Sequence, residues 1–89
     1  MNAILTVIGK DKVGIIAAVS AGLAKLNINI LDINQTVMKD YFTMIMLVDI
    51  GKANVGYDEI KKTLNQLSEE IGLEIRIQRE EIFQSMHRI

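Results

Sequence analysis

The chain has 89 residues, of which 49% are hydrophobic and 24% are charged, and its formal net charge is −1. This length fits one domain, residues 1–89, and the apolar fraction is sufficient for a single core without disulfides or metals. Because there is no cysteine, disulfides, thiolate metal sites and cysteine nucleophiles are excluded. Every arginine lies within residues 76–88, and the lack of a basic stripe argues against direct binding of nucleic acid.

The longest uncharged run, residues 13–24, is too short to span a membrane. A strand-like segment precedes the first lysine, which argues against a secretory signal peptide. The lack of cysteine also fits a reducing compartment. We therefore expect a cytoplasmic protein that does not interact with membranes.

Hydrophobic periodicity predicts a strand and then a helix in the first third of the chain. Residues 2–8 are apolar or β-branched on both faces, which is typical of a strand in the middle of a sheet. A helix is predicted over residues 13–26, with Asp11 where an N-cap is expected and Asn27 at its end. Its apolar side chains recur at helical spacing: Ile15, Ile16, Val19, Leu23 and Leu26.

The next two strands are predicted to form an antiparallel hairpin. Residues 28–38 and 41–50 are strand-like, and only the polar pair Lys39-Asp40 separates them. In the first of these strands the apolar residues change face near Leu31, which indicates a β-bulge or a bend.

A second helix, a fourth strand and a short tail helix are predicted after residue 56. Asp58 lies in the first turn of this second helix, and Gly72 follows its last turn. Residues 73–78 alternate as a strand, and residues 79–89 are amphipathic at helical spacing. The apolar positions of the second helix and of the tail are Ile60, Leu64, Leu67 and Ile71, then Ile82, Phe83, Met86 and Ile89.

The order β-α-β-β-α-β predicts an α+β, ferredoxin-like sandwich. It consists of a four-stranded antiparallel sheet with two helices on one face, plus the short C-terminal helix. This fold explains a repeat in the sequence: IGKDKVG at 8–14 and IGKANVG at 50–56 agree at five of seven positions. Both stretches are predicted to be corners where a strand leads into a helix, with glycines where the chain turns or where backbones come close.

One face of the predicted sheet remains without helices. Residues 41–48 are apolar on both sides of the strand, so this face would expose methionine and aliphatic side chains. The pattern predicts a homodimer or a higher homo-oligomer in which a second chain, or its tail helix, covers the face. The alternative is that the chain's own tail covers it.

The first glycine-bracketed loop does not match a known catalytic or nucleotide-binding motif. Residues 9–14 read G-x-x-x-x-G but lack the Lys and Ser/Thr of a phosphate-binding loop. An acylphosphatase-like site would need an arginine in this region, and RNA binding would need aromatic residues on the middle strands. The single histidine, His87, has no partners at metal-ligand spacing. We therefore predict no enzyme, no cofactor and no metal site.

The start of the first helix offers backbone N–H groups that attract carboxylates. Asp11 beside them could accept an ammonium group, so the corner suits a small zwitterion such as an amino acid. The alternative is that Asp11 only caps the helix.

The segments GKDKVGII at 9–16 and NINI at 27–30 resemble the ACT domain, a βαββαβ regulatory module of amino-acid metabolism. DINQTVM, YFTMIMLVD and the ending RIQREEIFQSMHRI further resemble stand-alone single-ACT proteins of uncharacterised function. These are similar to the N-terminal part of the glycine cleavage system transcriptional repressor.

The resemblance implies that an amino acid binds between two subunits. One subunit would contribute the loop after the first strand, and its neighbour would contribute the start of the second strand. The implied ligand-binding residues are Asp11, Lys12, Val13, Gly14 and Ile15 of one chain and Asn29, Ile30 and Leu31 of the other. We expect a non-enzymatic regulatory module that dimerises, binds a small amino acid and signals to a separate, unknown partner protein. The alternative is a protein-interaction adaptor without a small ligand, which would act through the sheet face and the tail.

Overall fold

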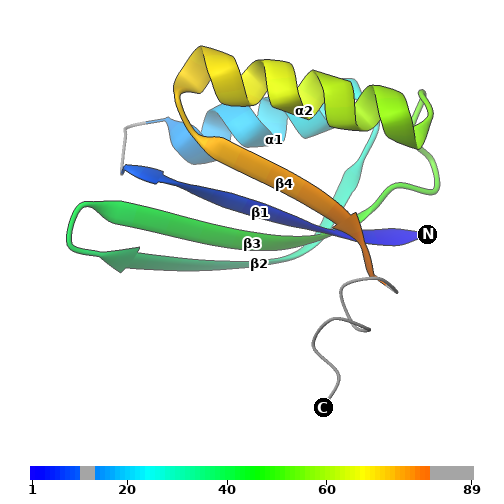
Figure 1. Ribbon diagram of the computed structural model, residues 1–89. Coiled ribbons are helices and arrows are strands. Elements are labelled where there is room, and N and C mark those ends of the chain that lie inside the picture. Colours follow the sequence, from blue (N-terminus) through cyan, green and yellow to red (C-terminus); the bar gives the residue numbers. More distant parts are fainter. Residues whose placement is uncertain (11–13, 81–89) are drawn as a thin grey trace.

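The computed structural model describes residues 1–10 and 14–80. Six elements follow one another in these residues: β1 (Asn2–Lys10), α1 (Ile15–Lys25), β2 (Asn29–Met38), β3 (Tyr41–Asp49), α2 (Tyr57–Ile71) and β4 (Glu74–Arg79). The strands form one sheet in the order β2-β3-β1-β4, in which every neighbouring pair is antiparallel. Both helices lie on the same face of this sheet (Figure 1). The predicted ferredoxin-like fold is confirmed, whereas the predicted tail helix falls mainly on residues 81–89, which lie outside the described residues.

The core lies between the helices and the two central strands, β1 and β3. As predicted from its apolar residues on both faces, β1 is central, with β3 on one side and β4 on the other. The side chains that these two strands bury are Ala3, Leu5, Val7, Phe42, Met44, Met46 and Val48. One expectation is wrong: Met44 and Met46 lie under the helices, and the open face of β3 carries Ile45 and Leu47 instead.

The first helix begins two residues later than the sequence pattern predicted. Its N-cap residue is Gly14, and Asp11 lies outside the described residues. Ile15, Val19, Leu23 and Leu26 are buried as expected. Ile16 was predicted to belong to the same buried stripe, but it is 39% exposed, because the turn that carries it points toward the cavity at the start of the helix.

The hairpin of β2 and β3 has the predicted irregularity and the predicted turn. The register of the two strands shifts between Ile30 and Asp32, where the apolar residues change face. Lys39 in the turn has a φ of 56°. With the bulge and the turn in place, β2 pairs with β3 from Asn29 to Met38, and it forms one edge of the sheet.

The second helix agrees closely with its prediction. Ile60 and Leu64 are buried, and Leu67 and Ile71 pack against the core from its margin. Gly72 at the C-cap has a φ of 70°, a left-handed conformation that glycine adopts without steric cost. No helix in residues 1–10 and 14–80 is long and apolar enough to cross a membrane.

Two asparagines connect the end of α1 to the corner between β3 and α2. The Asn27 side chain donates a hydrogen bond to the Lys52 carbonyl at 2.7 Å, and the Asn54 side chain donates one to the Lys25 carbonyl at 3.0 Å. The Asn54 backbone N–H also donates to the Leu26 carbonyl at 3.1 Å. The Asn54 side chain thus satisfies a carbonyl of the last turn of α1, which has no N–H partner within the helix. The Asn27 side chain satisfies a carbonyl of the loop between β3 and α2.

We expect Asn54→Ala to lower the free energy of unfolding by about 1 kcal/mol, because it removes one hydrogen bond to a helix-terminal carbonyl. Urea denaturation followed by circular dichroism measures the change. Asn65→Ala, at an exposed position of α2, is the matched control and should be neutral or slightly stabilising, since alanine favours helices. Equal losses in the two variants would contradict a structural role for Asn54.

Candidate ligand-binding site

The start of α1 presents backbone N–H groups that no described side chain caps. Gly14, the N-cap residue, has a φ of 87° and a ψ of 5°, and within residues 1–10 and 14–80 no side chain makes a capping hydrogen bond there. The first intrahelical hydrogen bond joins the Ala18 N–H to the Gly14 carbonyl at 2.9 Å. The N–H groups of the first turn therefore have no partner within the helix, and the helix dipole favours an anion beside them.

A cavity of about 250 Å³ adjoins this helix start. Its lining comes from α1 and from the hairpin: Gly14, Ile15, Ile16, Ala17, Gln35, Val37 and Phe42. Gln35 and Val37 were not predicted from the sequence to line a site. The available signal was the hairpin register, which pairs Val37 with the buried Phe42 and so brings this part of β2 next to the helix start.

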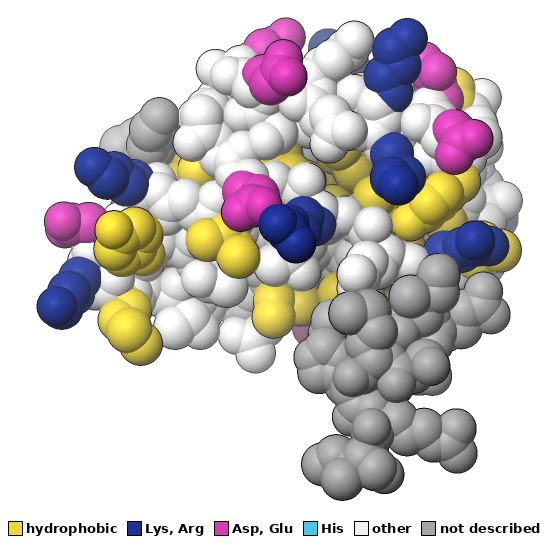
Figure 2. All heavy atoms as spheres, viewed as in Figure 1, with side chains coloured by type: hydrophobic (Ala, Val, Ile, Leu, Met, Phe, Trp, Pro, Cys, Tyr) yellow, Lys and Arg dark blue, Asp and Glu magenta, His cyan; other side chains and the backbone are white. Residues whose placement is uncertain are grey.

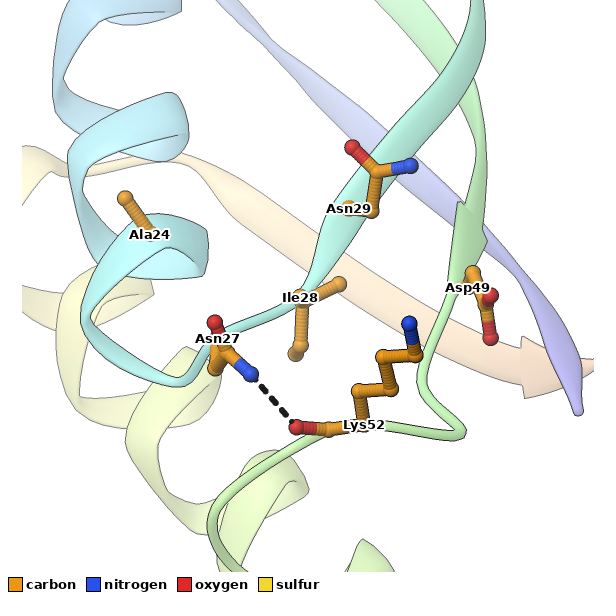
Figure 3. Close-up of a pocket in the computed structure, with 6 residues that line it drawn as sticks. All are labelled: Ala24, Asn27, Ile28, Asn29, Asp49 and Lys52. Carbon is orange, nitrogen blue, oxygen red and sulfur yellow. Dashed lines mark hydrogen bonds between the residues drawn. The ribbon is translucent and has the colours of Figure 1, made fainter.

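A larger cavity of about 370 Å³ lies at the other end of α1. Ala24, Asn27, Ile28, Asn29, Asp49 and Lys52 line it. In Figure 3 the Lys52 side chain extends into the space between Asn29 and Asp49. The Asp49 carboxylate accepts a hydrogen bond from the Gly51 N–H at 2.8 Å, and it lies 3.7 Å from the N-terminal ammonium group. This cavity therefore combines a cation, an anion and two side-chain amides, groups that can bind both ends of a zwitterion.

The two predicted halves of the ligand site lie far apart within one chain. The helix between them has 11 residues, which corresponds to a length of about 16 Å. Gly14 and Ile15 line the smaller cavity, and Asn29 lines the larger one. One amino acid cannot contact both halves of the same chain, so a site of this composition requires two chains.

The remaining predicted site residues differ in what they can contribute. The Ile15 side chain is buried, so only its backbone is available to a ligand. Ile30 is half-buried and packs against the core, whereas Leu31 is exposed at the bulge. Asp11, Lys12 and Val13 lie outside the described residues.

Close packing of α1 on the sheet does not explain why residue 14 is a glycine. No heavy atom of the described residues lies within 4 Å of a Cβ atom built at this position, so the left-handed φ is what favours glycine here. Close packing occurs at Gly9 instead, where a Cβ atom would overlap the Leu73 Cδ2 atom. The two glycines of the first corner thus have different roles.

Tyr57 lies away from both cavities and has a structural environment. Its hydroxyl group donates to the Ile77 carbonyl at 3.2 Å, and the Arg79 guanidinium lies 5.5 Å from its ring centroid. Burial raises the pKa of the Tyr57 hydroxyl; the charge of Arg79 partly offsets this, while that of Asp58 adds to it. Among the described residues, no group of three or more His, Asp or Glu side chains could hold a metal ion.

The profile of the ACT domain family matches residues 2–78, which include all six elements except the last residue of β4. The chain belongs to the ACT domain family. A UPF0237 protein of Clostridium acetobutylicum is 56% identical over 89 residues, which cover 100% of both chains. The predicted resemblance to ACT domains and to single-domain relatives is confirmed.

Solved structures agree with this assignment. An ACT domain protein from Streptococcus pneumoniae has a TM-score of 0.82 and 39% identity, and the match covers 94% of each chain. A protein designated as a glycine cleavage system transcriptional repressor has a TM-score of 0.76 and 24% identity, and the match covers 88% of this chain and 44% of that one. The second likeness shows that the fold is shared.

We expect Gly14→Ala to lower the free energy of unfolding by about 1–2 kcal/mol, the cost of a left-handed conformation for alanine. Gly14→Asn should cost less, because asparagine tolerates this conformation and open space surrounds the position. Urea denaturation of the two variants and the parent chain measures the difference. A larger loss for asparagine than for alanine would indicate crowding instead of backbone strain.

Proposed function

We propose that this ACT domain is a non-enzymatic regulatory module that dimerises through β2 and binds a small amino acid between the two subunits. The observation that carries the proposal is the separation of the two half-sites within one chain, at opposite ends of α1. A twofold dimer brings the missing half to each site. ACT domains are typically regulatory and ligand-binding, which supports the same function.

The edge of β2 is the surface that supports this dimer. Apart from the half-buried Ile30, every residue of β2 is exposed. Apolar side chains are exposed at Leu31, Ile33, Val37 and Met38, and a ten-residue strand of this kind offers unpaired backbone groups to another chain. Natural edge strands are usually protected by charge, proline or short length, and Asp32 is the only charged residue within β2.

Twofold symmetry determines which residues approach one another across this edge. Two identical edge strands related by a twofold axis pair antiparallel, and centred pairing places the axis near residues 33–34. Residues 29–31 of one chain then lie opposite residues 36–38 of its partner. Val37 lines the cavity at the start of α1, so each dimer would have two composite sites, each with the start of β2 from one chain and the helix start from the other.

The chemistry of each half suits one end of an amino acid. The backbone N–H groups after Gly14 would donate hydrogen bonds to the carboxylate, with support from the helix dipole. The Asn29 side chain and the Asp49 carboxylate would bind the ammonium group. The ligand would favour the subunit arrangement that it bridges and would thereby signal to a separate partner protein, which we expect to be cytoplasmic like this chain.

Isothermal titration against the twenty amino acids tests the ligand directly. We expect one or a few small amino acids to bind, and Asn29→Ala to weaken binding about tenfold or more, because it removes a hydrogen bond to a charged group. Asn65→Ala, on the exposed side of α2, is the matched control and should bind as the parent does. If no amino acid binds the parent chain, the sensor function is wrong.

We expect Ile33→Lys to prevent dimerisation and ligand binding together, since it places two like charges near the proposed axis. Analytical ultracentrifugation gives the mass of the particle, and titration gives the affinity. Gln66→Lys adds the same charge to α2 and should change neither. Full ligand affinity in a monomeric Ile33→Lys protein would contradict a site composed of two chains.

A protein-interaction adaptor without a small ligand is the second candidate. Val37, Met38 and Tyr41 at the end of the hairpin are 57%, 70% and 58% exposed. Figure 2 shows hydrophobic side chains at this end of the molecule, next to the β2–β3 turn. A comparison of pull-downs with the full chain and with a chain lacking residues 79–89, both without added amino acid, tests this alternative, because an adaptor that acts through the sheet face and the tail would bind its partner without a ligand and would lose it with the tail.

A further inference from the structure

Lys52 is a charged residue of the larger cavity that the proposed ammonium site does not use. This cavity, of about 370 Å³ at the end of α1, has Asp49 and Lys52 as the charged residues of its lining. The proposed function assigns Asn29 and Asp49 to the ammonium group of the ligand. Because like charges repel, a lysine ammonium in the same cavity disfavours a ligand whose only charge there is positive. The position of Lys52 therefore needs another explanation.

Neither an ion pair nor a helix end accounts for this side chain. Lys52 forms no ion pair within residues 1–10 and 14–80. In Figure 3 its side chain points from the loop toward β2 and β3 and away from the end of α1, so it does not serve the last carbonyls of that helix. The Lys52 backbone has the structural role instead, because its carbonyl accepts the hydrogen bond from the Asn27 side chain at 2.7 Å. The ammonium group is thus available to an acceptor from outside the chain.

The Asp49 carboxylate retains one oxygen atom for a ligand. Its Oδ1 atom accepts the hydrogen bond from the Gly51 N–H at 2.8 Å and is also the atom that faces the N-terminal ammonium group. Both contacts use Oδ1, which leaves Oδ2 for a ligand donor. The cavity therefore contains an anionic acceptor and a cationic donor that are not paired with each other, which makes two neighbouring subsites of opposite charge.

Closure of the composite site makes this unpaired lysine selective. In the proposed dimer the partner's helix start approaches the start of β2, next to Asn29, and removes water from the cavity. An ammonium group that loses water without gaining an acceptor is strongly disfavoured. A ligand with an aliphatic side chain would leave Lys52 in that state, whereas a side-chain carboxylate would form a charge-assisted hydrogen bond with it.

We propose that the ligand is an acidic amino acid, aspartate or glutamate, and that Lys52 is the residue that selects it; this inference rests on the proposed function. The α-carboxylate contacts the N–H groups after Gly14 of one chain, and the α-ammonium group contacts Asn29 and Asp49 of the other. The side-chain carboxylate contacts Lys52 beside them. Each of the three charges of the ligand then meets a group of opposite sign, and the positive end of α1 balances the net negative charge of the ligand.

Isothermal titration of the full chain with aspartate, glutamate, their amides asparagine and glutamine, and the aliphatic valine and leucine tests this assignment. We expect an acidic amino acid to bind at least about tenfold more tightly than its own amide, because the amide offers Lys52 no charge. Lys52→Met retains the length of the side chain and the backbone carbonyl that Asn27 binds, so the circular dichroism spectrum should be unchanged. The preference for the acid over the amide should disappear in this variant.

Lys62→Met is the matched control, because it removes the same charge at an exposed position of α2 and should keep the preference. An unchanged preference in Lys52→Met would overturn the role of Lys52. Tighter binding of valine or leucine than of either acid would also overturn it, and would indicate that the apolar lining of the smaller cavity, which includes Ile16 and Val37, selects the ligand. Both results would leave the amino-acid sensor intact. If none of the twenty amino acids binds the parent chain, the proposed function itself is wrong, and this inference is wrong with it.

Discussion

The main constraint on this molecule is that both helical connections lie on the same face of a four-stranded antiparallel sheet. Burial of Leu5, Met44 and Met46 under α1 and α2 provides the core. The same arrangement leaves one face without helices and leaves β2 at an edge that no element of the described chain covers. The core, the face without helices and the exposed edge are therefore consequences of a single topology.

The two corners between strand and helix serve different purposes although their sequences repeat. The second corner is tied to the end of α1 by Asn27 and Asn54, so it stabilises the domain. The first corner ends in Gly14, which has a left-handed conformation and lines the cavity at the start of α1. A corner held by hydrogen bonds suits a structural role, whereas N–H groups that have no partner within the helix suit an anionic ligand.

The fold could be predicted because its signals are local. Apolar residues on both faces identified β1 as central, the change of face near Leu31 located the bulge, and Gly72 marked the end of α2. The site could be predicted only in part, because it depends on which distant segments meet. Nothing local to Gln35 or Lys52 distinguishes a cavity-lining residue from an exposed one. The methionines of β3 were assigned to the wrong face for the same reason: a strand that is apolar on both sides does not indicate which side the helices cover.

A ligand that bridges two subunits links affinity to assembly by thermodynamic necessity. If each composite site needs Gly14 from one chain and Asn29 from the other, an isolated chain offers only half of the contacts. At each site, the dimer binds the amino acid more tightly than the monomer does by some factor. By linkage, the bound amino acid raises the dimerisation constant by the same factor. A partner protein that recognises the assembled form would respond to the amino acid without contacting it.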